Sequence, residues 1–350
     1  MSYDLAIYVA EELSPAELAE LVRVSPGLER LDGPATLGGE SVHLRVGQGA
    51  RRTYGFTVEG PIAVEPQDVP EEITAVALGI KYLFQVFVEG TADASVPHAI
   101  RFARRLSKQL SGAVLDLQTG EVWPKKSLRT RPSPVSPVKT DIVEICWYID
   151  ADKRPQGLAE RFLRLARRNL PEALPRQFGV REPFQGRLDR DGDQGFVDMC
   201  EAAPGDTNFM VGTYPVGLGY IDGAGRKRPM SMVSMTVDRA ALTTEPWRQA
   251  LRRLFIEFSI ESRSAFARAE VLRNYVWKSR WFNSSKESES AIDPCYIGQW
   301  TGLSTYPQWW TWYGPDYVEL VTPYLHGQAE VHPDGLFHSG QTSRWAVMSS

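Results

Sequence analysis

Three histidines near the end of the chain have the residue type, though not the spacing, of a metal site. His326, His332 and His338 are separated by six residues each, and imidazoles are common ligands of zinc and copper. This spacing fits neither the H-E-x-x-H helix nor a zinc finger. Glycine, proline and aspartate surround the three histidines, so we expect a loop-rich tail in place of a preformed metal site.

An acidic run and two pairs of carboxylates could also do chemistry. Asp189, Asp191 and Asp193 alternate as in a calcium loop, but the sixth position holds glutamine where the loop requires glycine, and the twelfth holds cysteine where it requires glutamate. We interpret this run as a solvated acidic turn. The pairs Asp198 with Glu201 and Glu257 with Glu261 have the residue types for acid/base catalysis; exposed charges on helix surfaces are the simpler interpretation.

The remaining motifs point to no cofactor. The glycine-rich run at residues 217–225 lacks the G-x-G-x-x-G spacing and is followed by a strand-like segment, so it predicts a hairpin or a mobile loop with a basic tip at residues 226–228. His43 and His98 have no nucleophile motif beside them. Cys146, Cys200 and Cys295 are far apart and predict buried free thiols. We therefore expect no catalytic residue, no metal and no cofactor.

Composition restricts the classes of partner. The chain has 350 residues and a formal net charge of −4, which gives no general reason to expect nucleic-acid binding. No apolar run approaches the length of a membrane span, and the first residues lack the pattern of a signal peptide. We expect a cytoplasmic protein that binds neither membrane nor nucleic acid.

Periodicity predicts an α+β fold made of two α+β units with mostly antiparallel sheets. The predicted parts are an N-terminal unit at residues 1–123, a proline-rich basic linker at 124–140, and a C-terminal unit at 141–350. In the first unit we expect strands at 5–9, 41–46, 55–59, 82–89 and 113–117, and helices that begin near 15 and 97. In the second we expect strands at 142–149, 195–202, 209–214 and 230–237, and helices at 158–169 and from 244 past 266. The order of elements suggests a pseudo-duplication, which residue identities do not support.

Tryptophan is concentrated near the end of the chain: six of ten indoles lie within residues 277–313. Such rings either close a core or present a recognition surface. Because neighbouring residues of a strand face opposite sides, we expect at least one of Trp309, Trp310 and Trp312 to be exposed. We predict that these three residues and Tyr313 contact a partner.

Two sets of segments resemble a known family. They are residues 112–123, which read Gly-Ala-Val-Leu-Asp-Leu-Gln-Thr-Gly-Glu-Val-Trp, and the pieces 302–304, 307–309 and 312–314. These are similar to segments of bacterial polymorphic-toxin immunity proteins. The resemblance implies a cytoplasmic, non-enzymatic inhibitor that binds a cognate toxin and occludes its active site.

The leading hypothesis is therefore an immunity protein whose partner is a protein toxin. Residues 59–93 carry seven acidic residues and one lysine, and an acidic surface of this kind could accelerate association with a basic toxin. Glu71 and Glu72 are the predicted contacts there. Two alternatives stay open at this point: a hydrolase with a carboxylate, histidine or metal site between the units, and a structural or assembly component that self-associates through the aromatic segment.

Overall fold

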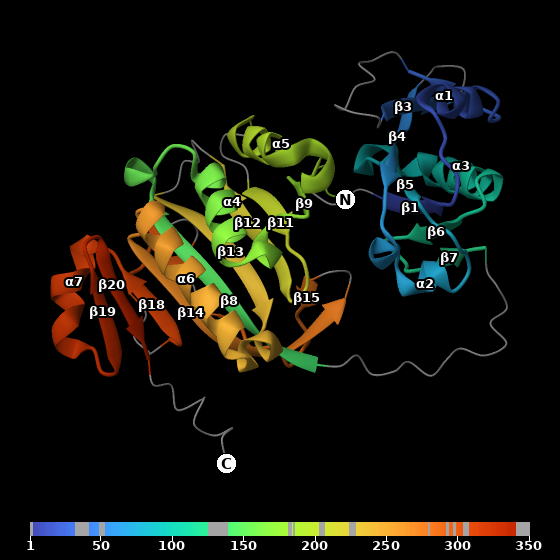
Figure 1. Ribbon diagram of the computed structural model, residues 1–350. Coiled ribbons are helices and arrows are strands. Elements are labelled where there is room, and N and C mark those ends of the chain that lie inside the picture. Colours follow the sequence, from blue (N-terminus) through green and yellow to red (C-terminus); the bar gives the residue numbers. More distant parts are fainter. Residues whose placement is uncertain are drawn as a thin grey trace. The chain divides into compact units, whose positions relative to one another are not determined.

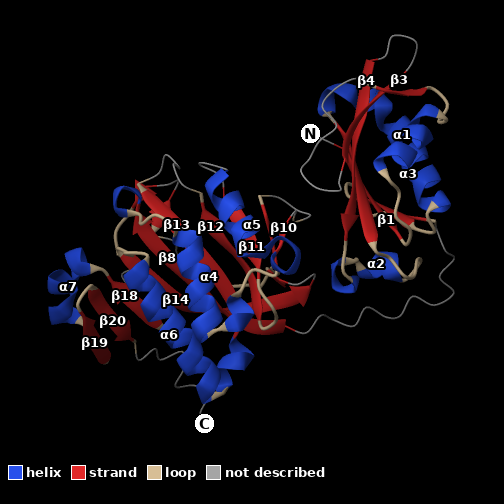
Figure 2. Cartoon of the chain, turned by 45° about the horizontal axis from the view of Figure 1, so that its top comes forward, coloured by secondary structure: helices blue, strands red, loops and turns tan. Residues whose placement is uncertain are grey.

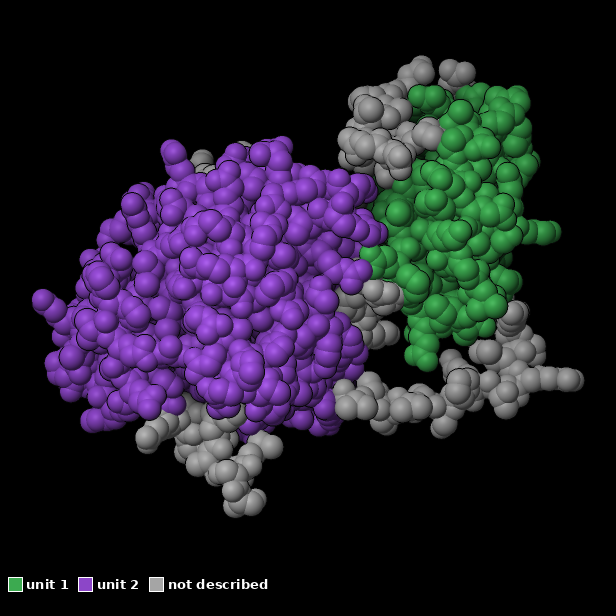
Figure 3. All heavy atoms as spheres, in the orientation of Figure 1, with its two compact units in different colours: residues 1–134 green, residues 135–350 purple. Residues whose placement is uncertain are grey.

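The computed structural model describes residues 3–31, 42–48, 53–124, 139–180, 184, 186–202, 207–223, 229–278, 281–291, 294–296, 299–303 and 308–340. The chain divides into two compact units, Met1–Pro134 and Val135–Ser350 (Figure 3). Most of the predicted linker, residues 125–138, lies outside the described residues, so its exact limits stay a prediction.

The first unit is a seven-stranded sheet with two main helices on it, and every strand pairing in it is antiparallel. Its elements are β1 (Tyr3–Val9), α1 (Pro15–Arg23), β2 (Leu28–Arg30), β3 (Val42–Gln48), β4 (Thr53–Ala63), η1 (Pro66–Asp68), α2 (Glu71–Thr74), β5 (Tyr82–Val88), η2 (Gly90–Ser95), α3 (Val96–Gln109), β6 (Ala113–Asp116) and β7 (Val122–Trp123). The strand order is β2-β3-β4-β5-β1-β6-β7.

Local sequence explains how this unit is built. Helix α1 starts with the predicted capping box, in which Glu17 N donates to Ser14 Oγ and Ser14 N donates to Glu17 Oε2. Apolar residues of α1 and α3 pack on alternate residues of β1, such as Leu5 and Ile7. Gly112 lies where a Cβ atom would be 2.1 Å from the Tyr8 carbonyl oxygen. Only glycine therefore lets β6 begin this close to β1.

The second unit contains an eleven-stranded antiparallel sheet and a small hairpin (Figure 1). Its elements are β8 (Lys139–Asp150), η3 (Ala151–Lys153), α4 (Leu158–Asn169), η4 (Pro171–Ala173), β9 (Gln177–Gly179), β10 (Gly186–Arg187), α5 (Leu188–Ala202), β11 (Thr207–Val211), β12 (Val216–Asp222), β13 (Met230–Asp238), η5 (Arg239–Thr243), α6 (Glu245–Glu261), β14 (Phe266–Lys278), β15 (Trp281–Asn283), β16 (Cys295–Tyr296), β17 (Gln299–Trp300), β18 (Trp310–Tyr313), α7 (Pro315–Val321), η6 (Thr322–Tyr324), β19 (Gln328–His332) and β20 (Gly335–Ser339). The order is β10-β9-β11-β12-β13-β8-β14-β18-β20-β19, with β15 on β14.

Helices α4 and α6 cover one face of this sheet (Figure 2). Trp147 and the alternate residues Val143, Ile145 and Ile149 of β8 belong to the main core with these helices, and the Trp147 indole donates to the Phe255 carbonyl at 3.2 Å. Tyr148, on the other face, packs with Phe266 and Trp300. The central strand is therefore buried on both faces, which matches its long apolar sequence.

The two units share a topology, as the order of elements suggested. In each, the first strand lies inside the sheet, between the strand that precedes the long helix and the strand that follows it: β1 between β5 and β6, and β8 between β13 and β14. In each, a shorter helix follows the first strand, and a meander of at least three strands precedes the long helix. The α+β class and the antiparallel sheets are confirmed.

The loop-rich tail expected around the three C-terminal histidines is wrong, because β19 and β20 pair there as a hairpin. Two of the predicted elements are wrong as well. Residues 195–202 belong to helix α5, not to a strand, because Phe196, Val197 and Cys200 bury one helical face. The long helix does not continue past residue 266. It ends at Glu261, and Arg263 takes a positive φ of 57° that turns the chain into β14. The predicted hairpin at residues 217–225 is confirmed for β12 and β13; its tip, residues 224–228, lies outside the described residues.

A buried arginine organises the sheet face opposite α6. Arg268 of β14 is 2% exposed. It donates to Glu144 at 2.8 Å, to Glu270 at 3.3 Å and to the Tyr148 hydroxyl at 3.2 Å. Burial acts to lower the pKa of Arg268, but Cys146, Tyr148 and Glu144 outweigh it and raise that pKa. Because Glu144 and Glu270 face each other across β8 and β14, Arg268 holds two like charges together.

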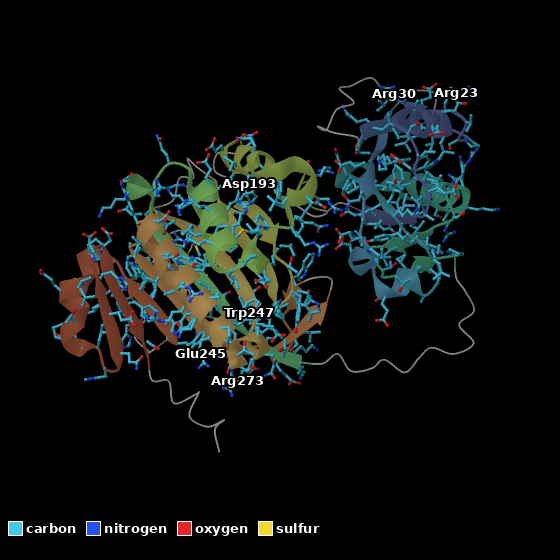
Figure 4. All side chains as sticks on the ribbon, viewed as in Figure 1. Arg23, Arg30, Asp193, Glu245, Trp247 and Arg273 are labelled. Carbon is cyan, nitrogen blue, oxygen red and sulfur yellow. The ribbon has the colours of Figure 1, made fainter. Side chains whose placement is uncertain are left out.

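We predict that Arg268→Leu lowers the free energy of unfolding by about 3 kcal/mol, because it leaves two facing carboxylates without their cation. Arg167→Leu is the matched control. Arg167 pairs at 2.7 Å with Asp193, which is labelled in Figure 4, but both side chains are half-exposed, so its loss should cost less than about 1 kcal/mol. Urea unfolding measures the loss of stability in both variants. Equal losses would contradict the role of Arg268 as the cation that holds Glu144 and Glu270 together.

We also expect an acid-sensitive contact in the first unit. Asp116 accepts from the Tyr3 hydroxyl and from the backbone N–H groups of Gln118 at 2.9 Å and Thr119 at 3.1 Å. Burial opposes ionisation, but these hydrogen bonds outweigh it and lower the pKa of Asp116. Burial, and then Asp116 itself, raise the pKa of Tyr3 to about 12.

Because the pKa of Asp116 is lower in the folded state, its contribution to stability is complete above the unfolded value of about 3.9 and is lost as pH falls through the folded value. Asp116→Asn should therefore destabilise the protein at pH 7 and reduce the loss of stability between pH 5 and pH 2. Denaturant unfolding across this range measures how the stability of each protein depends on pH. Parallel pH profiles for the two proteins would refute the prediction.

Candidate functional site

The tryptophan-rich segment builds the end of the larger sheet. Strand β18 pairs with β14 on one side and with β20 on the other, and β20 pairs with β19, which forms the edge. The sequence Trp-Thr-Trp-Tyr of β18 alternates its side chains between the two faces. Trp310 and Trp312 therefore share the face that α6 covers, and Thr311 and Tyr313 share the other.

An aromatic layer fixes this end of the sheet to α6. The ring centroids of Phe255 on α6, Trp310 and Phe337 on β20 lie 5.9–6.1 Å apart. Trp309 stacks on Trp310 at 3.9 Å with an angle of 18° between the rings. Trp309, Trp310 and Trp312 are 9%, 3% and 0% exposed. The expectation that at least one of these three indoles is exposed is therefore wrong.

The reason is that Trp309 precedes β18, which begins at Trp310, so strand alternation does not apply to it, and Trp310 and Trp312 lie two residues apart on the same face. On the opposite face, Tyr313 packs on Phe266 at 5.9 Å, and Phe266 in turn packs on Trp300 at 5.9 Å. Residues 299–303 thus cover the second face, where Trp300 and Leu303 contact this cluster. Burial raises the pKa of the half-buried Tyr313. Direct partner contact by Trp309, Trp310, Trp312 and Tyr313 stays a prediction.

Large apolar side chains are exposed just beyond this layer. Leu320 of α7, Tyr324 of η6 and Val331 of β19 are 66%, 79% and 77% exposed. We call these three residues, together with the outer edge of β19, the edge surface. Exposed apolar groups on neighbouring elements are typical of interaction sites. Sequence reasoning missed all three, because no pattern separates them from core residues of a short helix and strand.

The outer edge of β19 carries no further strand in the described part of the chain. Pro333 and Asp334 form a two-residue turn, and His332 opposes Gly335. Ladder hydrogen bonds alternate along an antiparallel pair, so the backbone groups of Ala329 and Val331 point away from β20. They are available to a strand from another protein.

Polar contacts hold the edge surface in place. The His338 imidazole contacts the His326 carbonyl at 2.8 Å and so fixes the loop between η6 and β19. Lys153 pairs with Asp316 at 2.7 Å at the start of α7. Arg252 of α6 pairs with Glu330 of β19. Polar contacts therefore attach α7, the loop after η6 and β19 to the rest of the unit.

Glu71 and Glu72 lie in the first unit, on the short helix α2. Both are exposed, whereas the next residue, Ile73, is fully buried and attaches the helix to the core. Leu78, which follows in the next loop, is 84% exposed. Two acidic residues and an apolar one thus stand out from the same small protrusion.

The other candidates from sequence are held in ion pairs or apart from one another. Glu257 and Glu261 pair with Arg168 and Arg164 of α4. Asp189, Asp191 and Asp193 pair with Arg187, Arg190 and Arg167, and Asp198 accepts from Gln194. His332 packs on the Trp312 ring at 5.5 Å, away from the contact that joins His326 and His338. No group of His, Cys, Asp and Glu residues that could hold a metal ion occurs among the described residues.

Cysteine burial agrees with the sequence where it can be observed. Cys146 and Cys200 are buried and free, and burial raises the pKa of the Cys200 thiol to about 12. The Cys295 side chain lies outside the described residues. Within the described chain, no helix has both the length and the apolar character needed to cross a bilayer.

Comparisons with known proteins give little further information. No protein-family model and no curated protein sequence matches the chain. Among solved structures, the T6SS protein PA0821 of Pseudomonas aeruginosa aligns with 60% of this chain and 75% of its own, at 13% identity and a TM-score of 0.39. A similarity at this level carries no argument about function.

We predict that Gly335→Ala destabilises the second unit by about 1–3 kcal/mol. A Cβ atom there would lie 2.4 Å from the Trp312 ring and 2.5 Å from the Tyr313 carbonyl oxygen, so β20 would have to move from the aromatic layer. Gln328→Ala on the exposed edge is the control and should change stability by less than about 0.5 kcal/mol. Thermal unfolding compares the two, and a Gly335→Ala protein as stable as the control would contradict this packing.

Proposed function

We propose that this chain is a non-enzymatic binding protein, an immunity protein that inhibits a cognate bacterial protein toxin by covering its active site. The observation that carries the proposal is the edge surface: three large apolar side chains, each at least 66% exposed, beside an open strand edge. The toxin as partner is taken from the resemblance of residues 112–123 and of the pieces 302–304, 307–309 and 312–314 to immunity proteins.

The edge surface has the properties of a docking site for a protein strand. Main-chain hydrogen bonds from Ala329 and Val331 would give affinity, and the exposed Val331, Leu320 and Tyr324 side chains would supply apolar contact. The aromatic layer behind β19 keeps the surface in one conformation, which lowers the entropy cost of binding. Trp309, Trp310, Trp312 and Tyr313 would then act by positioning the surface.

The acidic protrusion offers a second contribution, through long-range attraction. Residues 59–93 carry a net charge of −6, and Glu71 and Glu72 are exposed within them. Charge complementarity mainly raises association rates. We propose that these residues guide a basic toxin toward the complex.

The first test captures the partner from the source bacterium with the tagged chain and measures its affinity for variants. Val331→Lys should weaken binding at least about tenfold, because it places a charge in a desolvated contact. Leu117→Lys is the matched control, since Leu117 is 50% exposed in the first unit. Equal affinity of both variants would refute docking on the edge surface. A partner whose activity is unaffected by the chain would refute the immunity function.

The second test addresses the acidic residues. Glu71→Lys combined with Glu72→Lys should slow association several-fold at low salt and have little effect at high salt. Glu172→Lys combined with Glu201→Lys changes the net charge equally in the second unit, where Glu201 is exposed and Glu172 is partly exposed. Stopped-flow association kinetics separates the two pairs. If both pairs slow association alike, the effect belongs to net charge and not to the protrusion.

A further inference from the structure

Helix α3 of the first unit is strongly basic. Its fourteen residues include Arg101, Arg104, Arg105 and Lys108 and no acidic residue. Its apolar face, with Ala99, Phe102, Ala103 and Leu106, is buried. The positive charge is therefore confined to the outer side of the helix, and the proposed function of the edge surface does not involve it.

Two of these arginines line a cavity. An open cavity of about 130 Å³ lies between the segment that follows α1 and the outer side of α3. His98, Arg101 and Arg105 form its α3 wall, and their spacing places them on one side of the helix. The rest of the lining includes the polar Ser25 and the apolar Leu28 and Phe102.

The arginines of the cavity are not neutralised within the described chain. Arg105 donates to the Val24 carbonyl at 3.1 Å and lies 3.5 Å from Ser25 Oγ. Arg101 donates to the Pro97 carbonyl at 3.3 Å and to His98 Nδ1 at 3.1 Å. No carboxylate of the described residues pairs with either guanidinium. Both keep N–H donors for a ligand.

The equivalent helices of the second unit make the contrast clear. There α6, which corresponds to α3, carries Glu257 and Glu261, and these pair with Arg168 and Arg164 of α4. The crossing of the two helices is thus internally balanced in the second unit. In the first unit, by contrast, α3 carries four basic residues and no acidic one, and part of its basic side lines a cavity.

We propose that this cavity binds the phosphate group of a small organic phosphate. Two guanidinium groups match a phosphate dianion in charge, and their planar N–H donors suit its oxygens. His98 accepts from Arg101 at Nδ1, so its ring proton lies on Nε2 and provides a further donor. Leu28 and Phe102 offer an apolar wall to the organic part of the ligand.

The test titrates the full chain with phenyl phosphate, inorganic phosphate and benzoate, by calorimetry at low salt. Phenyl phosphate should bind most tightly, because it combines the dianion with a ring. Arg101→Gln should weaken its binding at least about tenfold. Among the described residues, the side chain of Arg101 hydrogen-bonds only within its own helix, so this variant should unfold at the wild-type temperature.

Lys108→Gln is the control: it removes the same charge from the same helix outside the cavity lining, and should change affinity less than about twofold. Tighter binding of benzoate than of phenyl phosphate would replace phosphate by a carboxylate ligand and so overturn the proposal. Absence of binding of all three probes at millimolar concentration would overturn it too, as would equal affinity of Arg101→Gln and Lys108→Gln.

Discussion

The need to remove three neighbouring indoles from water governs the C-terminal end of this protein. Trp309, Trp310 and Trp312 satisfy it by packing between α6 and β20, and truncating a buried ring of this size typically costs about 3–5 kcal/mol. The packing fixes β18, β20 and β19 as one rigid extension of the sheet. The exposed residues of the edge surface are held in position because the residues behind them are so well buried.

An open strand edge beside apolar side chains is a hazard for a protein that acts alone. In this chain the edge strand is only five residues long, and Glu330 within it is paired to α6. These features limit uncontrolled pairing, yet Ala329 and Val331 keep outward backbone groups. The combination suits a surface that pairs with one partner of fitting shape. The units also differ in charge: ion pairs join α4 and α6, whereas among the described residues no carboxylate pairs with Arg101 or Arg105 of α3.

Local chemistry made much of the fold predictable. The capping box at Ser14, the linker composition and the strand periodicity led to the α+β class, and the order of elements led to the shared topology. Burial of all three indoles was not predicted, because the sequence does not show that β18 begins only at Trp310, which leaves Trp309 outside the alternation and stacked on Trp310. Helix α5 was missed since its buried positions 196, 197 and 200 fit two periods over so short a span. The edge surface could not be found either: Val331 is a residue type typical of a core strand, and it is exposed because no described strand pairs with the outer edge of β19.

Amide hydrogen exchange of the chain, alone and in complex with its captured partner, tests the central claim most directly. If the partner docks on the edge surface, the outward amides of Ala329 and Val331 should exchange rapidly in the free chain and become protected in the complex, together with residues of α7. Protection confined to other elements, with unchanged exchange along β19, would contradict the account.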